Sequence, residues 1–281
     1  MDSQQFFDHL WQDFVGLAPQ AADICRKLTQ QGEQVVNDHV AFRTFNRAPL
    51  NIASLETMIF SLGYQRLESY HFKNKHLNAW SYMKPSAGGR EEPLIFFSEL
   101  DVMALSAQSQ EIIDRLIEEV IGQFEGVERL RASFQDRPLF AEGRLWSMIS
   151  YAEYEHLLKE SEYAAWLALH GFHANHFTVS LNHLTHYKSV ESMLTWVESE
   201  GFTVNASGGR VKGGADLLLE QGSTMADQVE VTFGCGHRCK VPGCFYEFAL
   251  RYPTPEGALF MGFVEGNADK IFESTRHQPN P

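Results

Sequence analysis

The chain has 281 residues, of which 44% are hydrophobic and 21% are charged, a composition typical of a folded globular protein. Its 23 Lys and Arg residues are outnumbered by 36 Asp and Glu residues, and the formal net charge of -13 argues against nucleic-acid binding and adhesion to anionic membranes. No apolar run approaches the ~18 residues that a membrane span needs. The N-terminal residues lack the features of a signal peptide, and four cysteines are too few for a disulfide framework. We therefore predict a cytoplasmic protein.

The first part of the chain is expected to be a helical cap followed by a mixed module. Residues 1–31 form the predicted cap, because apolar residues recur there at three-to-four spacing on both sides of Pro19. Residues 33–100 form the predicted first module, whose helix is closed by Gly63. Its predicted elements are a strand at 35–45, a helix at 54–62 and strands at 64–70, 79–83 and 94–97.

The second part is expected to contain a helical insertion and another mixed module. The predicted insertion comprises residues 101–169, because segments 105–124 and 152–169 place aliphatic residues among acidic ones at helical spacing. The predicted second module comprises residues 170–264, and residues 265–281 are predicted to be a tail. The second module has a predicted helix at 190–200 and predicted strands at 173–181, 202–206, 215–220, 228–233 and 244–252.

The two modules share a pattern of strand with histidine, helix, then glycine followed by an aromatic residue. His39 precedes Gly63 by 24 positions, and His176 precedes Gly201 by 25. The matched spacing favours an internal repeat over coincidence, although short helices that end in glycine are common. We predict an α+β fold in one domain, 1–281, in which two βαβββ modules form one cupped, mostly antiparallel sheet with added helices. This resembles the vicinal oxygen chelate architecture, in which residues of both modules hold a metal in the cup.

The first predicted strand carries a polar face. Side chains alternate along a strand, so His39, Ala41 and Arg43 share one face while Val40 and Phe42 point to the other. The Cα atoms of His39 and Arg43 are ~13 Å apart at the usual strand rise. A long arginine can lean back toward a ligand bound at the histidine, and its planar guanidinium suits a carboxylate. The alternative is a solvated strand face with a chance histidine.

The second module supplies a matching histidine and an acid. His176 occupies the position related to His39 by the repeat, which neither His170 nor His173 does. Glu247 lies among aromatic and aliphatic residues, where an acid is costly unless it is paired or bound to a metal.

These residues leave several ligand sets and metals open. Arg251 lies on the same strand face as Glu247, so a structural Glu247–Arg251 pair is the alternative to a metal ligand. Glu99, at the end of the last strand of the first module, is a lower-ranked ligand. Two histidines and one carboxylate form the facial triad of Fe(II) oxygenases, and the same ligands also bind Zn(II) or Mn(II).

Two glycine-rich segments present further candidates. Cys235, Cys239 and Cys244 surround His237, but their spacing matches no standard zinc motif, so packing within the loop is favoured over a zinc site. The loop 207–214 either binds an anion through Arg210 and Lys212 or forms a mobile hairpin tip. No Walker A, G-x-S-x-G, H-E-x-x-H or G-x-G-x-x-G motif occurs.

Three motifs together resemble the DUF1338 family, which includes the 2-oxoadipate dioxygenase/decarboxylases, also called hydroxyglutarate synthases. They are the strand His39-x-x-x-Arg43, the run Asn175-His176-Phe177-Thr178, and the most specific piece, Val241-Pro242-Gly243-Cys244-Phe245-Tyr246-Glu247-Phe248-Ala249. The resemblance spans roughly the whole chain and is to the short form of the family. It implies Fe(II) held by His39, His176 and Glu247, with Arg43 on a substrate carboxylate.

The resemblance also implies a reaction. The substrate would be a 2-oxo dicarboxylic acid, most simply 2-oxoadipate, which reacts with O2 to give D-2-hydroxyglutarate and CO2 without a separate cosubstrate. The partners implied are thus a small 2-oxo acid and O2, with no nucleic acid or membrane. A non-oxidative metal-dependent isomerase or hydrolase, and a small-acid binding module without turnover, remain as alternatives. The sequence predicts no oligomeric state.

Overall fold

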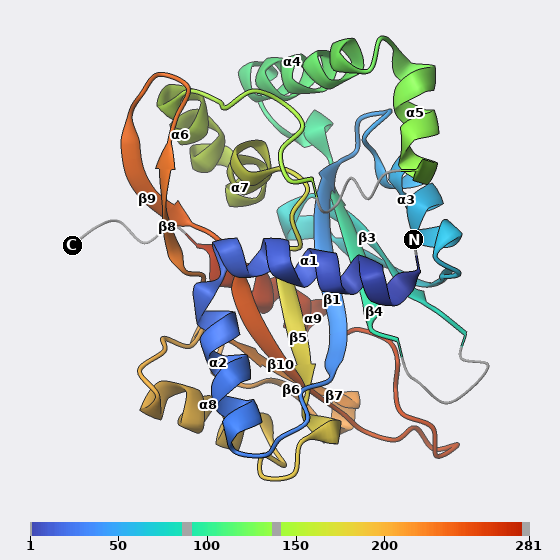
Figure 1. Ribbon diagram of the computed structural model, residues 1–281, viewed down its shortest axis with the longest axis vertical. Helices are drawn as coiled ribbons and strands as arrows, with labels where there is room; N and C mark the ends of the chain where they lie inside the picture. Colours follow the sequence, from blue (N-terminus) through green and yellow to red (C-terminus); the bar gives the residue numbers. More distant parts are fainter. Residues whose placement is uncertain (1, 86–91, 137–141, 277–281) are drawn as a thin grey trace.

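The computed structural model of the protein describes residues 2–85, 92–136 and 142–276 (Figure 1). An eight-stranded sheet forms its centre, with the strand order β2-β3-β4-β1-β5-β10-β7-β6. The first half of the sheet, with its helix, comprises β1 (Asn37–Phe45), α3 (Ile52–Ser61), β2 (Gln65–Phe72), β3 (Leu77–Met83) and β4 (Leu94–Leu100). The second half comprises β5 (His176–Ser180), α8 (Val190–Ser199), β6 (Lys212–Gly214), β7 (Leu219–Ser223) and β10 (Phe245–Arg251).

The remaining elements surround this sheet or extend from it. Before the first module come α1 (Ser3–Leu17) and α2 (Pro19–Gln30). Between the two modules lie α4 (Ala107–Gln123), α5 (Val127–Asp136), α6 (Tyr151–Glu160) and α7 (Glu162–His170). Strands β8 (Gln228–Thr232) and β9 (Arg238–Pro242) form a separate hairpin, and α9 (Glu265–Ile271) with the 3-10 helix η6 (Phe272–Thr275) follows β10.

The strand order shows that the two halves repeat one topology. In each half, the first strand pairs in parallel with the last one: β1 with β4 and β5 with β10. The other neighbouring strands of the sheet are antiparallel, including β1 and β5, which join the two halves at its centre. The predicted α+β fold with one mostly antiparallel sheet is therefore confirmed.

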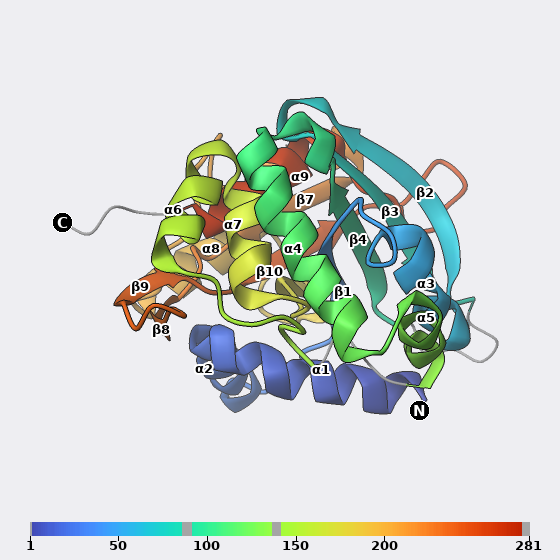
Figure 2. The ribbon, with the colours of Figure 1, turned by 90° about the horizontal axis from the view of Figure 1, so that it is seen from above.

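Two layers cover the sheet, one on each face (Figure 2). Helix α1 lies along one face, where Trp11 and Phe14 contact the rings of Phe177 and Tyr246. Helix α9 lies on the other face and contacts both β2 and β6, the two edge strands of the sheet. Because strands at opposite edges reach the same helix, the sheet curls around α9 and forms the predicted cup.

Local signals explain the boundaries that the hydrophobic pattern alone misplaces. The predicted helix at 152–169 is two helices, because the side chain of Ser161 accepts a hydrogen bond from the backbone of Ala164 and starts α7. The predicted strand at 202–206 is only a bridge between Val204 and Thr224. The predicted sheet strand at 228–233 lies instead in the β8–β9 hairpin, with Val231 opposite Cys239. Residues 265–275, expected to be tail, fold as α9 and η6.

Candidate metal centre

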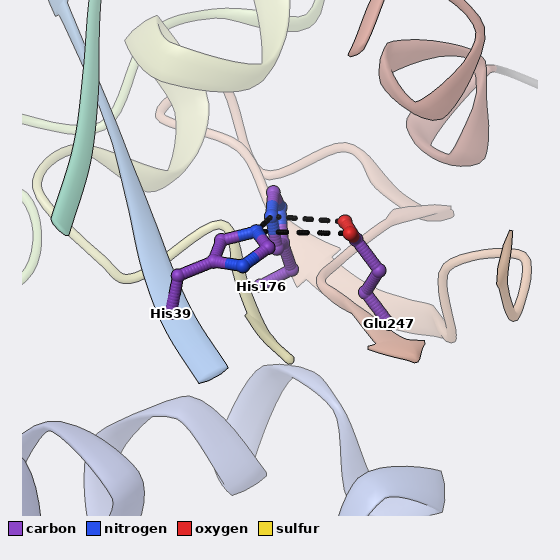
Figure 3. A group of neighbouring side chains, drawn as sticks. All are labelled: His39, His176 and Glu247. Carbon is purple, nitrogen blue, oxygen red and sulfur yellow. Dashed lines mark hydrogen bonds and ion pairs between the residues drawn. The ribbon is translucent and has the colours of Figure 1, made fainter. Parts of the chain in front are cut away.

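Three side chains from the middle of the sheet converge in the cup (Figure 3). His39 comes from β1, His176 from β5 and Glu247 from β10, and we refer to them as the metal triad. The Nε2 atom of His176 lies 3.2 Å from Glu247 Oε2 and 3.3 Å from His39 Nε2. His39 Nε2 lies 3.7 Å from Glu247 Oε1. All three residues are at most 6% exposed.

The sheet register produces this convergence. The central antiparallel pair sets Ala41 opposite His176 and His39 opposite Thr178, and the parallel pair of β5 with β10 sets Glu247 opposite Thr178 as well. The three triad residues therefore lie on one face of three adjacent strands. The repeat that the sequence shows thus becomes a single site because β1 and β5 are neighbours.

The outward contacts of the two imidazoles suit one tautomer. His39 Nδ1 lies 2.7 Å from Asp38 Oδ1, and His176 Nδ1 lies 3.2 Å from Asn175 Oδ1. An ionised carboxylate and an amide oxygen only accept, so the Nδ1–H tautomer satisfies both outward contacts, and in that tautomer the lone pair of each Nε2 points into the cup. The hydroxyl of Thr178, 3.1 Å from His39 Nε2, is a neutral donor at the rim of this cluster.

Glu247 adds a buried carboxylate to those two lone pairs. Its Oε1 accepts a hydrogen bond of 2.7 Å from the Gln221 side-chain amide, whereas its Oε2 has no hydrogen-bond partner within the part of the chain that the structure describes. Burial raises the pKa of Glu247, and burial together with the neighbouring His39 lowers the pKa of His176. In the Nδ1–H tautomer, a carboxylate oxygen and two imidazole nitrogens with lone pairs face one another, and this donor set fits a divalent cation. The triad therefore has the donor set, burial and orphaned oxygen of a metal site.

A buried ion pair supports His39 from behind. The alternative interpretation expected Arg251 to pair with Glu247, but it pairs with Asp38 instead. Its Nε and Nη2 donate to the Asp38 carboxylate at 2.7 and 2.9 Å. Its Nη1 donates to the carbonyls of Phe260 and Gly262. Burial alone would raise the pKa of Asp38, but the Arg251 charge and the hydrogen bonds hold it well below its usual range.

The sequence reasoning missed Asp38 for a structural reason. Strict alternation would place Asp38 on the face opposite His39. The register of β1 against β5 shifts between Asn37 and His39, and such a bulge turns the extra residue out of the alternation. An acid directly before a candidate ligand histidine was the only available signal.

Arg43 is a buried cation that forms no ion pair with a carboxylate of the described residues. Its side chain is packed among aromatic rings, with the guanidinium carbon 4.8 Å from the ring centres of both Tyr163 and Trp166. Nη2 donates to the Thr275 hydroxyl at 3.2 Å, while Nε and Nη1 have no partner among the described residues. Burial lowers the pKa of Arg43 to about 10, so the group stays charged at neutral pH. A desolvated fork with free donors is a site for a ligand carboxylate.

Three lower-ranked candidates lie outside the cup. Glu99 sits within β4 rather than in a loop, and its Oε2 accepts from the backbone of Ile52 at 2.9 Å, at the start of α3. Arg210 pairs with Glu191 and Glu198 of α8 at 3.1 and 3.0 Å. Lys212, the other cation of the loop 207–214, is buried and donates to backbone carbonyls.

The cysteines of the glycine-rich loop do not gather with His237 into a candidate metal site among the described residues. Cys244 is buried and its thiol contacts the carbonyl of Ala174, whereas Cys235 is exposed. Within residues 2–85, 92–136 and 142–276, the metal triad is the only group of three His, Cys, Asp or Glu side chains whose ligand atoms lie within 4.8 Å of one another. All four cysteines are free thiols.

The cavities around these groups differ in size and place. A cavity of about 20 Å³ adjoins the metal triad and is walled by Phe96, Phe263 and Phe272. A second, of about 220 Å³, adjoins Arg43. A hollow of about 740 Å³, larger than both, includes Tyr246 and lies on the opposite face of the sheet, away from the triad. The candidate site is therefore located by the chemistry of its side chains and not by cavity size.

Comparison with known proteins places the chain in a family. The family described as 2-oxoadipate dioxygenase/decarboxylase matches residues 13–260. The chain belongs to the 2-oxoadipate dioxygenase/decarboxylase family. A rice protein named 2-oxoadipate dioxygenase/decarboxylase, chloroplastic/amyloplastic, is 36% identical over 264 residues, which is 87% of this chain and 70% of the rice protein. The resemblance inferred from the three motifs is confirmed.

Solved structures of similar proteins extend the likeness to the fold of this family member. The structure of the Oryza sativa hydroxyglutarate synthase in complex with 2-oxoadipate matches with a TM-score of 0.88 at 32% identity. The match covers 96% of this chain and 91% of that one. A Shewanella frigidimarina protein described as a hydrolase has a TM-score of 0.84 at 40% identity, covering 94% and 98%. A Ralstonia eutropha protein described as glyoxalase superfamily shares the fold at TM-score 0.72 and 22% identity, covering 90% and 83%. The vicinal-oxygen-chelate-like architecture is thus confirmed.

Proposed function

We propose that this protein is an Fe(II)-dependent dioxygenase/decarboxylase that acts on a 2-oxo dicarboxylic acid, with 2-oxoadipate as the first substrate to test. One observation carries the proposal: a buried two-histidine, one-carboxylate triad lies on β1, β5 and β10, and β1 also carries a buried arginine that forms no ion pair among the described residues. The rice relative, whose structure contains 2-oxoadipate, supports this substrate class. The reaction balances, since 2-oxoadipate and one O2 contain the atoms of 2-hydroxyglutarate and one CO2. The expected product is D-2-hydroxyglutarate.

Each side chain has a defined role in the proposal. His39, His176 and Glu247 hold the metal, and a facial triad leaves coordination positions free for substrate and O2. Bound Fe(II) supplies a redox-active centre that lets a 2-oxo acid react with O2. Arg43 holds the distal carboxylate of the substrate, because its Nε and Nη1 are buried and have no hydrogen-bond partner in the described parts of the chain. The aromatic wall of the cavity keeps bulk water from the reacting atoms.

The same ligands also suit Zn(II) or Mn(II), so a non-oxidative reaction is a second candidate. The description of the Shewanella frigidimarina relative as a hydrolase favours it. A module that binds a small acid without turnover is the third. Oxygen consumption separates the first candidate from the other two, because neither hydrolysis nor simple binding uses O2.

The experiment is oxygen uptake by protein loaded anaerobically with Fe(II), started by adding 2-oxoadipate. We expect O2 consumed, CO2 released and D-2-hydroxyglutarate formed in equal amounts. Zn(II)-loaded protein and the His176→Ala variant are the matched controls and should consume no O2. Absence of O2 uptake by the wild type with iron shown to be bound would contradict the proposal.

We also infer a cytoplasmic location for the protein. Free cysteines are typical of a reducing compartment, and none of the helices among the described residues is long and apolar enough to cross a bilayer. The rice relative is named chloroplastic/amyloplastic, so the compartment has to be measured in cells of the source organism. Cell fractionation with an antibody to the chain makes that measurement, and recovery with an organelle would refute the inference.

A further inference from the structure

The segment Glu265–Thr275, which forms α9 and η6, closes the open side of the cup and is anchored first to β2 and the turn that follows it. The backbone N–H of His71 donates to the Glu265 carboxylate at 2.7 Å. Lys75 donates to the Glu273 carboxylate at 2.6 Å. Both contacts reach the first module, although the segment follows the last strand of the second.

The same segment is anchored to the second module through buried polar contacts. The Asn205 side-chain amide donates to the Ser274 hydroxyl at 2.8 Å, and the backbone N–H of Ala226 donates to the Ser274 carbonyl at 2.8 Å. The Asn267 side-chain amide donates to Gln221 Oε1 at 3.1 Å, and Gln221 in turn donates to the triad carboxylate. Because it is held at both sides of the cup, the segment has a defined position over the metal triad.

Phe272 stands at the centre of this closure. It lines both the cavity of about 20 Å³ at the metal triad and the cavity of about 220 Å³ at Arg43. Its ring centre lies 5.8 Å from the guanidinium carbon of Arg43 and 6.4 Å from the ring centre of Tyr163. On another side its ring packs edge-on against Phe72 at 5.4 Å. The ring thus forms a wall common to the two cavities.

The sizes of the two cavities give this wall a consequence. A cavity of about 20 Å³ holds about one water molecule, so no 2-oxo dicarboxylic acid fits beside the triad while the wall stands. The carboxylate site at Arg43 lies in the other cavity. Among the described residues, Phe272 is the one that the linings of the two cavities share, so its ring stands between the triad and the Arg43 site.

We propose that Phe272 is a specificity-determining gate, whose ring moves aside to join the two cavities and thereby admits a dicarboxylic acid that spans from the triad to Arg43. The proposal rests on the proposed function, since it takes that acid as the ligand. Gate opening precedes ligand contact with the metal, so at high ligand concentration it limits the rate of association. A smaller side chain at this position removes the barrier, and a larger one strengthens it.

The test is anaerobic rapid mixing of 2-oxoadipate with Co(II)-loaded protein, followed by the visible absorbance of the cobalt, which reports ligand arrival at the metal without turnover. For the wild type we expect an association rate that levels off with 2-oxoadipate concentration. For Phe272→Ala we expect a rate at least ten times faster without levelling off, and for Phe272→Trp a slower rate. Phe60→Ala, a replacement of a 42% exposed ring on α3, is the matched control and should behave as the wild type.

The outcomes separate the gate from the proposed function. Equal kinetics for the wild type, Phe272→Ala and Phe272→Trp, in proteins that bind Co(II) equally well, would overturn the gate and leave the oxygenase reaction standing if the iron-loaded wild type consumes O2. No absorbance change and no O2 uptake by the wild type would overturn both. If Phe272→Ala loses Co(II) binding or unfolds, Phe272→Leu replaces it, with a smaller acceleration expected in the same direction.

Discussion

Replacing Asp38 with asparagine tests whether the buried pair behind His39 supports the metal site. The side chains of Asp38 and Arg251 are 5% and 3% exposed, and three polar contacts converge on the Asp38 carboxylate: two from Arg251 and one from His39 Nδ1. Asparagine keeps the shape and an acceptor oxygen but removes the charge. Arg251 then stays buried without a counter-ion, which costs about 3–5 kcal/mol of the free energy of unfolding in comparable pairs.

The same change should weaken metal binding. A carboxylate on the outer nitrogen of a ligand imidazole fixes its tautomer and orientation, and its loss typically reduces metal affinity about 10–100-fold. We therefore expect Asp38→Asn to lower the affinity for Co(II) by that factor at neutral pH, measured by competition with a chelator. The stability loss is measured separately by urea unfolding of metal-free protein. Asp216→Asn, at an exposed aspartate, is the control.

The pH dependence of the free energy of unfolding tests the role of Asp38 in a second way. Because the folded-state pKa of Asp38 is depressed, the stability it confers is fully present above its unfolded pKa, about 4, and is lost as pH falls through the folded pKa. The stability difference between wild type and Asp38→Asn should accordingly shrink below about pH 4. Unchanged Co(II) affinity together with unchanged stability at neutral pH would refute the reasoning. Loss of stability with unchanged affinity would assign the pair to folding alone.

Three further variants probe the ligands, the carboxylate site and the acid limb. His176→Ala should lower Co(II) affinity at least about 100-fold in chelator competition, because it removes one of three protein ligands, and full occupancy would contradict that role. Arg43→Met should leave Co(II) affinity within about twofold and raise the KM for 2-oxoadipate at least about 30-fold, since a buried charged contact is worth about 2–5 kcal/mol. Metal-free Arg43→Met should also unfold at a higher urea concentration than metal-free wild type, because a buried cation without an ion pair is removed. An unchanged KM for 2-oxoadipate would exclude Arg43 from substrate binding. Burial lowers the pKa of His170 to about 3. The unfolded chain therefore binds a proton at this residue below about pH 6.5, whereas the folded protein does not until about pH 3. Between these two pH values, His170 lowers the free energy of unfolding by about 1.4 kcal/mol for each unit that the pH falls. His170→Leu should flatten that slope in urea unfolding of metal-free protein, and an identical slope would contradict it.

The sequence by itself determined the repeat and the residues worth testing as ligands. Strand alternation and helix punctuation are local properties, so the pattern around His39 and His176 is visible without any contact. The acid Glu247 stands out for the same local reason, as a charge within an apolar strand. The three residues lie together because the repeated modules join through β1 and β5.

Tertiary structure alone decided which polar groups serve the site and which do not. The bulge in β1 brings Asp38 beside His39, and Arg251 therefore pairs with Asp38 rather than with Glu247. Glu99 points to the start of α3 instead of into the cup. These partners are far apart in the chain, and nothing in strand periodicity encodes which distant group a charge will meet.

The closure of the cup was equally invisible from the sequence. Residues 265–275 show no strong amphipathic pattern. Their positions depend on hydrogen bonds to distant residues, such as the one that the Asn205 side-chain amide donates to the Ser274 hydroxyl. Phe272 reads as one more apolar residue near the end of the chain. Its place between the metal triad and Arg43 follows only once the sheet has curled, because the cavity exists only between elements that folding brings together.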